Sequence, residues 1–118
     1  MNTVYLLTTN KCNLSCEFCS VRADKHNAEH FHSISLDTFD DRIMPLLNEI
    51  QPRRVILTGG EPLMNKEVVQ IAQEIRKNLP DVYIMMQSNG FLIQDDEVLE
   101  KLSESIDSIE LVLPIIRN

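Results

Sequence analysis

The strongest constraint on the fold is a regular alternation of strand-like and helix-like segments. Four apolar runs rich in β-branched and aromatic residues are typical of strands, and the segments between them repeat apolar residues at helical spacing. A β-α-β-α-β-α-β order predicts an α/β domain with a parallel sheet and right-handed crossovers. The predicted strands are 3–9, 53–58, 82–87 and 108–116, and the predicted helices are 36–50, 65–79 and 95–106.

Capping and proline positions refine these helices. Ser35 is a suitable N-cap for the first helix, and Asn65 is a candidate N-cap for the second. Pro45 falls inside the first helical pattern, where a proline removes a backbone hydrogen bond. We therefore expect a kink or two short helices, ended by Pro52.

All three cysteines of the chain lie within eight residues, at Cys12, Cys16 and Cys19. Three cysteines so close cannot form a disulfide framework without leaving one over, but their thiolates can converge on one metal centre. A four-iron cluster that only carries electrons takes four protein ligands. Three ligands leave one iron open, and an open metal position can bind substrate or cofactor. The triplet therefore predicts a site that performs chemistry.

Two further motifs each follow a predicted strand. Gly59-Gly60-Glu61-Pro62 follows strand 53–58, and Gln87-Ser88-Asn89-Gly90 follows strand 82–87. Parallel α/β folds place their ligands at the carboxyl ends of strands. Glycines there allow the backbone to approach a ligand closely.

The cysteine spacing, with Phe18 as the aromatic residue before the last cysteine, resembles the cluster motif of the radical S-adenosylmethionine (SAM) family. The two later motifs resemble that family's Gly-Gly-Glu-Pro and Thr-Asn-Gly motifs and occur in the same order. The N-terminal motifs are most similar to those of peptide-modifying, maturase-type members. The resemblance covers most of the chain. It implies that residues 1–118 form a single, truncated core domain, half of a partial (β/α)6 TIM-like barrel.

The same resemblance implies cofactors. Cys12, Cys16 and Cys19 would ligate three irons of a [4Fe–4S] cluster, and SAM would chelate the fourth. Reductive cleavage of SAM would give a 5′-deoxyadenosyl radical that abstracts hydrogen from an unknown substrate, a peptide being one candidate. The SAM contacts are expected from the backbone near Phe18, from Gly59, Gly60 and Glu61 with Pro62 stiffening the turn, and from Ser88 and Asn89.

Other interpretations of the same residues stay open. The cysteines could form a structural zinc knuckle with His26, His30 or His32. The Gly-Gly pair also suits an ordinary strand–helix loop, and Asn-Gly is a common turn. The alternative function is a non-catalytic iron–sulfur or zinc-binding scaffold module, which would bind a metal without turnover.

Composition and charge disfavour some classes of partner. The formal net charge of −7 disfavours nucleic acid, because phosphate contacts need a basic surface. No apolar run approaches the roughly 18 residues that span a membrane, and the N-terminus lacks the features of a signal peptide. Free, clustered cysteines without a secretion signal indicate a reducing, cytoplasmic location.

The number of predicted strands raises a physical problem. The family's barrel has six strands, and four strands with helices leave an open edge and a half-covered apolar face. The chain could be a piece of a longer protein, form a homodimer, or dock on a partner protein that completes the half-barrel. We therefore do not expect the isolated chain to be a stable, active monomer.

Overall fold

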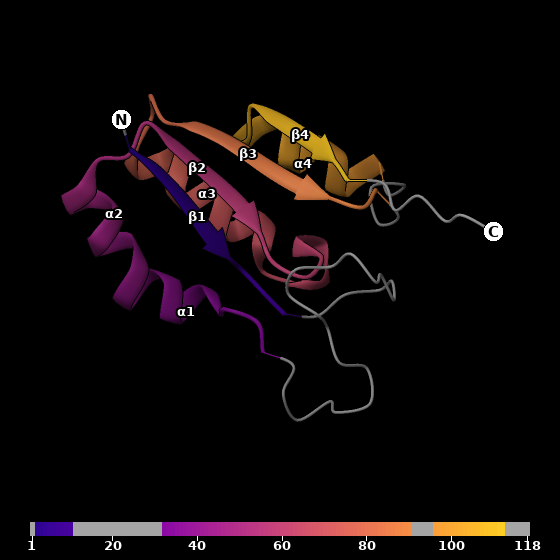
Figure 1. Ribbon diagram of the computed structural model, residues 1–118, viewed down its shortest axis with the longest axis horizontal. Helices are drawn as coiled ribbons and strands as arrows, with labels where there is room; N and C mark the ends of the chain where they lie inside the picture. The colour runs from indigo at the N-terminus through magenta and orange to yellow at the C-terminus, as the bar shows by residue number, and fades with distance from the viewer. Residues whose placement is uncertain (1, 11–31, 91–95, 113–118) are drawn as a thin grey trace.

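A computed structural model describes residues 2–10, 32–90 and 96–112 of the chain. These residues form a four-stranded sheet in the order β1-β2-β3-β4, and every neighbouring pair is parallel (Figure 1). The predicted α/β class and the parallel sheet are confirmed. The strands are β1 (Thr3–Leu7), β2 (Arg54–Thr58), β3 (Tyr83–Ser88) and β4 (Ser108–Leu111).

The first helical segment is interrupted, as Pro45 predicts. The helices α1 (Leu36–Thr38) and α2 (Met44–Ile50) are separated by a π-helical turn, η2 (Phe39–Ile43), in which the Met44 N–H donates to the carbonyl of Phe39. Pro45 stands in the first turn of α2, where its missing N–H leaves no bond unmade. The Ser35 hydroxyl accepts from the Thr38 N–H, which confirms the predicted N-cap.

The second and third helices pack over the same sheet. They are α3 (Val68–Asn78) and α4 (Asp96–Ser105). The prediction that Asn65 caps α3 is wrong, because this helix begins three residues later, with Glu67 at its cap position. The preceding residues form a short 3₁₀ turn, η3 (Pro62–Met64), that the sequence pattern did not reveal.

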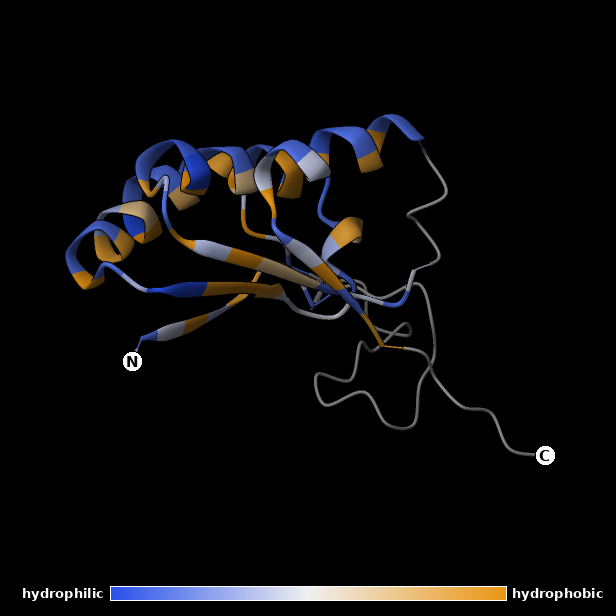
Figure 2. Cartoon of the chain, turned by 90° about the horizontal axis from the view of Figure 1, so that it is seen from above, coloured by the Kyte–Doolittle hydropathy of each residue, from blue (hydrophilic) through white to orange (hydrophobic). Residues whose placement is uncertain are grey.

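The hydrophobic core lies between the helices and one face of the sheet. Alternate residues of β2 and β3 point into it, and they meet the apolar face of α3 because strand side chains alternate between faces. Figure 2 shows the helices on one side of the sheet. The fully buried core residues include Val55, Leu57, Ile84, Met86, Ile71 and Ile75.

The opposite face of the sheet is not covered by any of the described helices (Figure 2). Tyr5, Ile56 and Met85 lie side by side on it, as the strand register shows. The side chains of Tyr5 and Leu7 are 61% and 51% exposed. The expectation of a half-covered apolar face is therefore confirmed for the described residues, whereas association with a second copy or a partner protein stays a prediction.

Among the described helices, none is both long enough and apolar enough to cross a membrane.

Candidate functional site

The carboxyl ends of β1 and β2 are joined by backbone hydrogen bonds. The Thr8 N–H donates to the carbonyl of Thr58 at 2.8 Å, and the Gly60 N–H donates to the carbonyl of Thr9 at 2.8 Å. The turn that follows β2 is thus attached to the end of β1. Asn10, three residues beyond the end of β1, precedes the cysteine segment in the sequence.

Gly59 is required by this close approach. Its φ of +148° lies where side chains are strained, and a β-carbon at this position would lie 2.3 Å from the Thr9 carbonyl oxygen. The Gly-Gly pair is therefore more than a flexible loop, because its first member lets the backbones of two neighbouring strand ends meet.

Glu61 connects the Gly-Gly turn to the end of β3. Its carboxylate is buried, and one oxygen accepts from the Asn89 N–H at 2.8 Å. The other oxygen accepts from the Ser88 hydroxyl at 3.0 Å and from the Leu63 N–H at 3.1 Å. A buried carboxylate is stable only when donors of this kind compensate its lost hydration. Glu61 therefore joins the two motifs that the sequence places 27 residues apart.

Ser88 and Gly90 shape the second motif. Ser88 is the last residue of β3 and is buried, and its oxygen also accepts from the Gly90 N–H at 3.1 Å. Because the single hydroxyl hydrogen of Ser88 is directed to Glu61, a ligand would find only the oxygen as an acceptor. Gly90 has a φ of +87°, which a glycine adopts without strain.

The structure brings six of the predicted SAM-contact residues together. Glu61, Pro62, Ser88 and Asn89 are brought together with the two glycines at one edge of the sheet, with Pro62 buried at the start of η3. The remaining predicted site residues lie outside the described residues. These are Cys12, Cys16, Cys19 and Phe18, together with His26 and His30 of the zinc interpretation.

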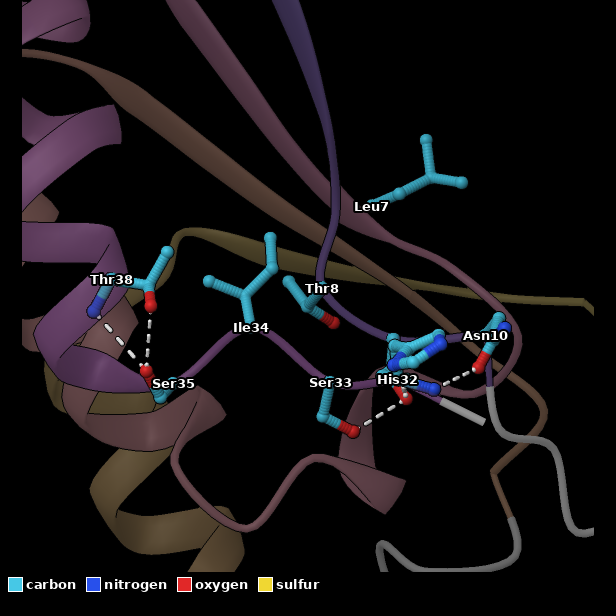
Figure 3. A pocket seen from close by; sticks show the side chains of 9 residues that line it. Leu7, Thr8, Asn10, His32, Ser33, Ile34, Ser35 and Thr38 are labelled. Atoms are coloured by element: carbon cyan, nitrogen blue, oxygen red, sulfur yellow. Dashed lines mark hydrogen bonds between the residues drawn. The ribbon is translucent and has the colours of Figure 1, made fainter. Parts of the chain in front are cut away.

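The residues that flank the cysteine segment, which spans residues 11–31, are joined to one another beyond the end of β1. Thr9 and Ser33 form an antiparallel bridge, and their hydroxyl oxygens are 2.7 Å apart. The Asn10 N–H donates to the carbonyl of His32 at 3.0 Å, and the His32 N–H donates to Oδ1 of Asn10 at 2.6 Å (Figure 3). The chain therefore leaves β1 and returns beside the residue from which it left.

A hollow of about 380 Å³ lies beside these paired residues, Thr9 and Asn10 with His32 and Ser33 (Figure 3). Its lining includes several hydroxyl-bearing residues together with the apolar residues Leu7 and Ile34, so it combines polar and nonpolar groups. Its lining runs from Leu7 to Asn10 on one side and from His32 to Ser35 on the other, with Thr38 at its end.

Asn65 is a further site residue whose place the sequence did not reveal. Its side chain is buried, and its amide nitrogen donates to the carbonyls of Thr8 and Ile34, both at 2.9 Å. Its Oδ1 accepts from the Glu67 N–H at 2.9 Å. Only the position of Asn65, just after the Gly-Gly-Glu-Pro motif, marks it in the sequence.

In the described part of the chain, no group of three or more His, Cys, Asp or Glu side chains is placed to hold a metal ion. His32 is the one histidine of the zinc interpretation that lies among the described residues. Its backbone N–H and carbonyl form the hydrogen bonds with Asn10.

Comparison with known protein families identifies the family of this chain. The family described as the radical SAM superfamily matches residues 6–113, nearly the whole chain. The chain belongs to the radical SAM superfamily. Membership implies SAM and a [4Fe–4S] cluster, and an odd set of three closely spaced cysteines suits a cluster with one open iron.

The curated relatives include proteins named GTP 3′,8-cyclase. That of Desulforamulus reducens is 28% identical over 115 residues, covering 92% of this chain and 35% of the relative. That of Clostridium perfringens strain 13 is 31% identical over 111 residues, covering 86% of this chain and 33% of the relative. The chain thus spans about a third of the length of these relatives.

Solved radical SAM structures share the fold. BtrN in complex with AdoMet and 2-DOIA has a TM-score of 0.77 at 18% identity, covering 93% of this chain and 44% of BtrN. Streptococcus suis SuiB bound to S-adenosylmethionine has a TM-score of 0.70 at 19% identity, covering 94% of this chain and 24% of SuiB. These likenesses confirm that the four strands correspond to part of a radical SAM partial barrel.

Proposed function

We propose that this chain provides the cluster-binding and SAM-binding part of a radical SAM enzyme. Cys12, Cys16 and Cys19 are the proposed ligands of a [4Fe–4S] cluster. The observation that carries the proposal is the Glu61 bridge, which joins the Gly-Gly-Glu-Pro turn to Ser88 and Asn89. This joined pair of turns stands at the sheet edge from which the cysteine segment departs.

Each described motif has a defined part in this proposal. Gly59 and Gly60 present backbone to the SAM ammonium group, and Pro62 and the buried Glu61 carboxylate hold that turn in place. Asn89 would bind the SAM carboxylate or ribose, and the Ser88 oxygen, which can only accept, would suit a ribose hydroxyl. The backbone near Phe18 would lie along adenine. The role of the Glu61 side chain is thus to position the turns, since its oxygens accept bonds from protein donors.

When bound, the cluster and SAM would supply reductive cleavage of the sulfonium to a 5′-deoxyadenosyl radical, which takes a hydrogen atom from substrate. This chain's own residues would orient SAM and limit access of water to that edge.

GTP is the substrate to test first, because the relatives bear the name of a GTP 3′,8-cyclase. These names favour a nucleotide over the peptide that the motifs suggested. The formal net charge of −7 offers little attraction for a triphosphate, so cations that bind it would come from outside this chain. We propose that activity on GTP also involves parts of the relatives that lie beyond the third of their length that this chain spans.

Anaerobic reconstitution with iron and sulfide tests the proposal. We expect about four irons per chain, as one cube requires, with broad visible absorbance and an EPR signal of the reduced cluster that SAM perturbs. Cys16→Ala should lose the cluster, whereas Ser103→Ala on the exposed side of α4 should keep it. A colourless protein that binds zinc would contradict the proposal and support the scaffold function.

A further inference from the structure

We propose that Asn65 is a positioning residue that fastens Thr8 and Ile34, which stand before and after the cysteine segment, to the turn that follows the Gly-Gly-Glu-Pro motif. This inference rests on the proposed function, since the cysteine segment would carry the cluster. It goes further by assigning a residue outside the recognised motifs the task of fixing the distance between the cluster ligands and the SAM-binding turn.

The amide group of Asn65 uses both of its hydrogens for this purpose. One hydrogen bond goes to the Thr8 carbonyl, before the cysteine segment, and the other goes to the Ile34 carbonyl, after it. Both N···O distances are 2.9 Å. Thr8 and Ile34 are themselves paired, because the Ile34 N–H donates to the Thr8 carbonyl at 2.8 Å. Asn65 thus closes a three-residue junction at the base of the segment.

The turn that carries Asn65 is fixed in its own right. The Asn65 N–H donates to the carbonyl of Pro62 at 3.0 Å, and its Oδ1 accepts from Glu67. The Glu67 carboxylate in turn accepts from the Leu36 N–H at the start of α1. Asn65 and Glu67 therefore bind the chain that follows the cysteine segment at two nearby residues, Ile34 and Leu36.

An amide is the side chain that suits this position. Asparagine supplies two donors and one acceptor, whereas aspartate has the same shape but no hydrogen to give when ionised. Asn65 is only 3% exposed, so water cannot readily replace the missing donors. In an Asn65→Asp variant the two carbonyls would lose their partner and face a carboxylate, and the junction would open.

Asn65→Asp is best compared with Asn78→Asp. Asn78 also donates from its amide to a backbone carbonyl, that of Glu74 at 2.8 Å, but it is exposed at the end of α3, far along the chain from the junction. Both variants remove one amide and add one negative charge. Because Asn65 is buried and Asn78 is exposed, only a difference confined to amides near Thr8 and Ile34 reports on the junction. Far-UV circular dichroism checks that each variant is folded, and Asn65→Ser, which is smaller and uncharged, replaces Asn65→Asp should the latter not fold.

The first measurement is hydrogen exchange of the Ile34 and Asn10 amides in the protein without iron. We expect exchange in Asn65→Asp to be faster by about tenfold or more than in wild type, because the buried junction has lost its donors. Exchange of the Met86 amide in β3 should change much less, and Asn78→Asp should leave all three amides unchanged. Equal acceleration at Ile34 and Met86 would show general destabilisation and overturn the proposal.

The second measurement is the rate at which a chelator removes iron from the reconstituted protein. We expect Asn65→Asp to lose iron about tenfold faster than Asn78→Asp, since its cysteine segment is less constrained. Loss of iron at equal rates in the two variants would overturn the positioning role. Failure of the wild-type chain to take up iron would instead refute the proposed function, and hydrogen exchange would still decide whether Asn65 fastens the segment.

Discussion

The Ser88 hydroxyl donates a hydrogen bond to the Glu61 carboxylate at 3.0 Å, inside the protein and across 27 residues of sequence. This single contact joins the turn after β2 to the end of β3, and the Asn89 N–H reinforces it at 2.8 Å. The geometry of both motifs therefore depends on one carboxylate, which makes Glu61 the first residue to test.

Glu61→Gln should destabilise the fold by about 1–3 kcal/mol, the penalty for a buried polar group without a proper partner. A glutamine places an NH2 group where a carboxylate oxygen now accepts, so two donors would face each other. Urea unfolding followed by circular dichroism measures the change. Glu104→Gln, on an exposed position of α4, is the control and should be neutral. A free energy of unfolding equal to that of the control would refute this role of Glu61.

Gly59→Ala should lower stability more than Gly90→Ala. Both glycines have positive φ, but the added methyl at position 59 meets the Thr9 carbonyl oxygen at 2.3 Å, whereas at position 90 it meets the Leu111 side chain at 3.4 Å. A side chain can move aside more readily than a backbone carbonyl. The backbone strain alone is about 1–3 kcal/mol in each variant. Thermal unfolding should place Gly59→Ala lowest, and the reverse order would contradict the close approach of the two strand ends.

Ser88→Thr should keep most of the stability that Ser88→Ala loses. Threonine retains the hydroxyl that donates to Glu61, whereas alanine removes this donor at a buried site, with an expected loss of about 1 kcal/mol. Ser103→Ala removes an exposed hydroxyl and serves as the matched control. Denaturant midpoints of the three variants test this, and an equal loss in Ser88→Ala and Ser88→Thr would show that packing rather than the hydroxyl matters.

Stability should fall in acid partly because of Asp107. Partial burial by itself would raise the pKa of Asp107, but hydrogen bonds from the Ile84 N–H and from Arg76, with the charge of Arg76, outweigh it and lower the pKa. A carboxyl whose folded pKa is lowered stabilises the fold above its unfolded pKa of about 3.9 and loses that contribution as pH falls through the folded pKa. Asp107→Asn should therefore reduce the slope of stability against pH below about pH 4.

The pKa of Asp40 is shifted in the opposite direction from that of Asp107. Desolvation, followed by repulsion from Glu74, Asp37 and Asp41, raises the pKa of Asp40. A raised carboxyl pKa means that its ionisation opposes folding as pH rises. Asp40→Asn should therefore keep the loss of stability in acid and raise the free energy of unfolding near neutral pH. Identical pH profiles for Asp40→Asn and Asp107→Asn, measured by urea unfolding, would contradict both assignments.

Much of the fold could be predicted from local patterns. The apolar runs of β2 and β3 and the helical spacing of α3 predicted the layers, and Pro45 marked the interruption between α1 and α2. The short turns η2 and η3 were missed because three to five residues carry too little periodicity to be recognised.

Sequence motifs identified residues of the site, but they did not show which of these residues contact one another. Gly59 and Ser88 stand in recognisable patterns, yet the sequence does not show that Glu61 faces inward to Ser88 rather than outward to SAM. A carboxylate between a glycine pair and a proline, directly after a buried strand, is one signal that could have suggested burial with partners. Asn65 was misread as a helix cap because its donors reach residues far away in sequence, and no local pattern records such contacts.

The pairing of Thr9 with Ser33 joins the chain before residue 11 to the chain after residue 31. Insertions or deletions between these two anchors should leave the register of the described strands untouched, since the entropy of closing a longer loop grows only slowly with length. The stretch between Asn10 and His32 could accordingly be exchanged for that of a relative as one cassette, while the scaffold that receives it stays the same.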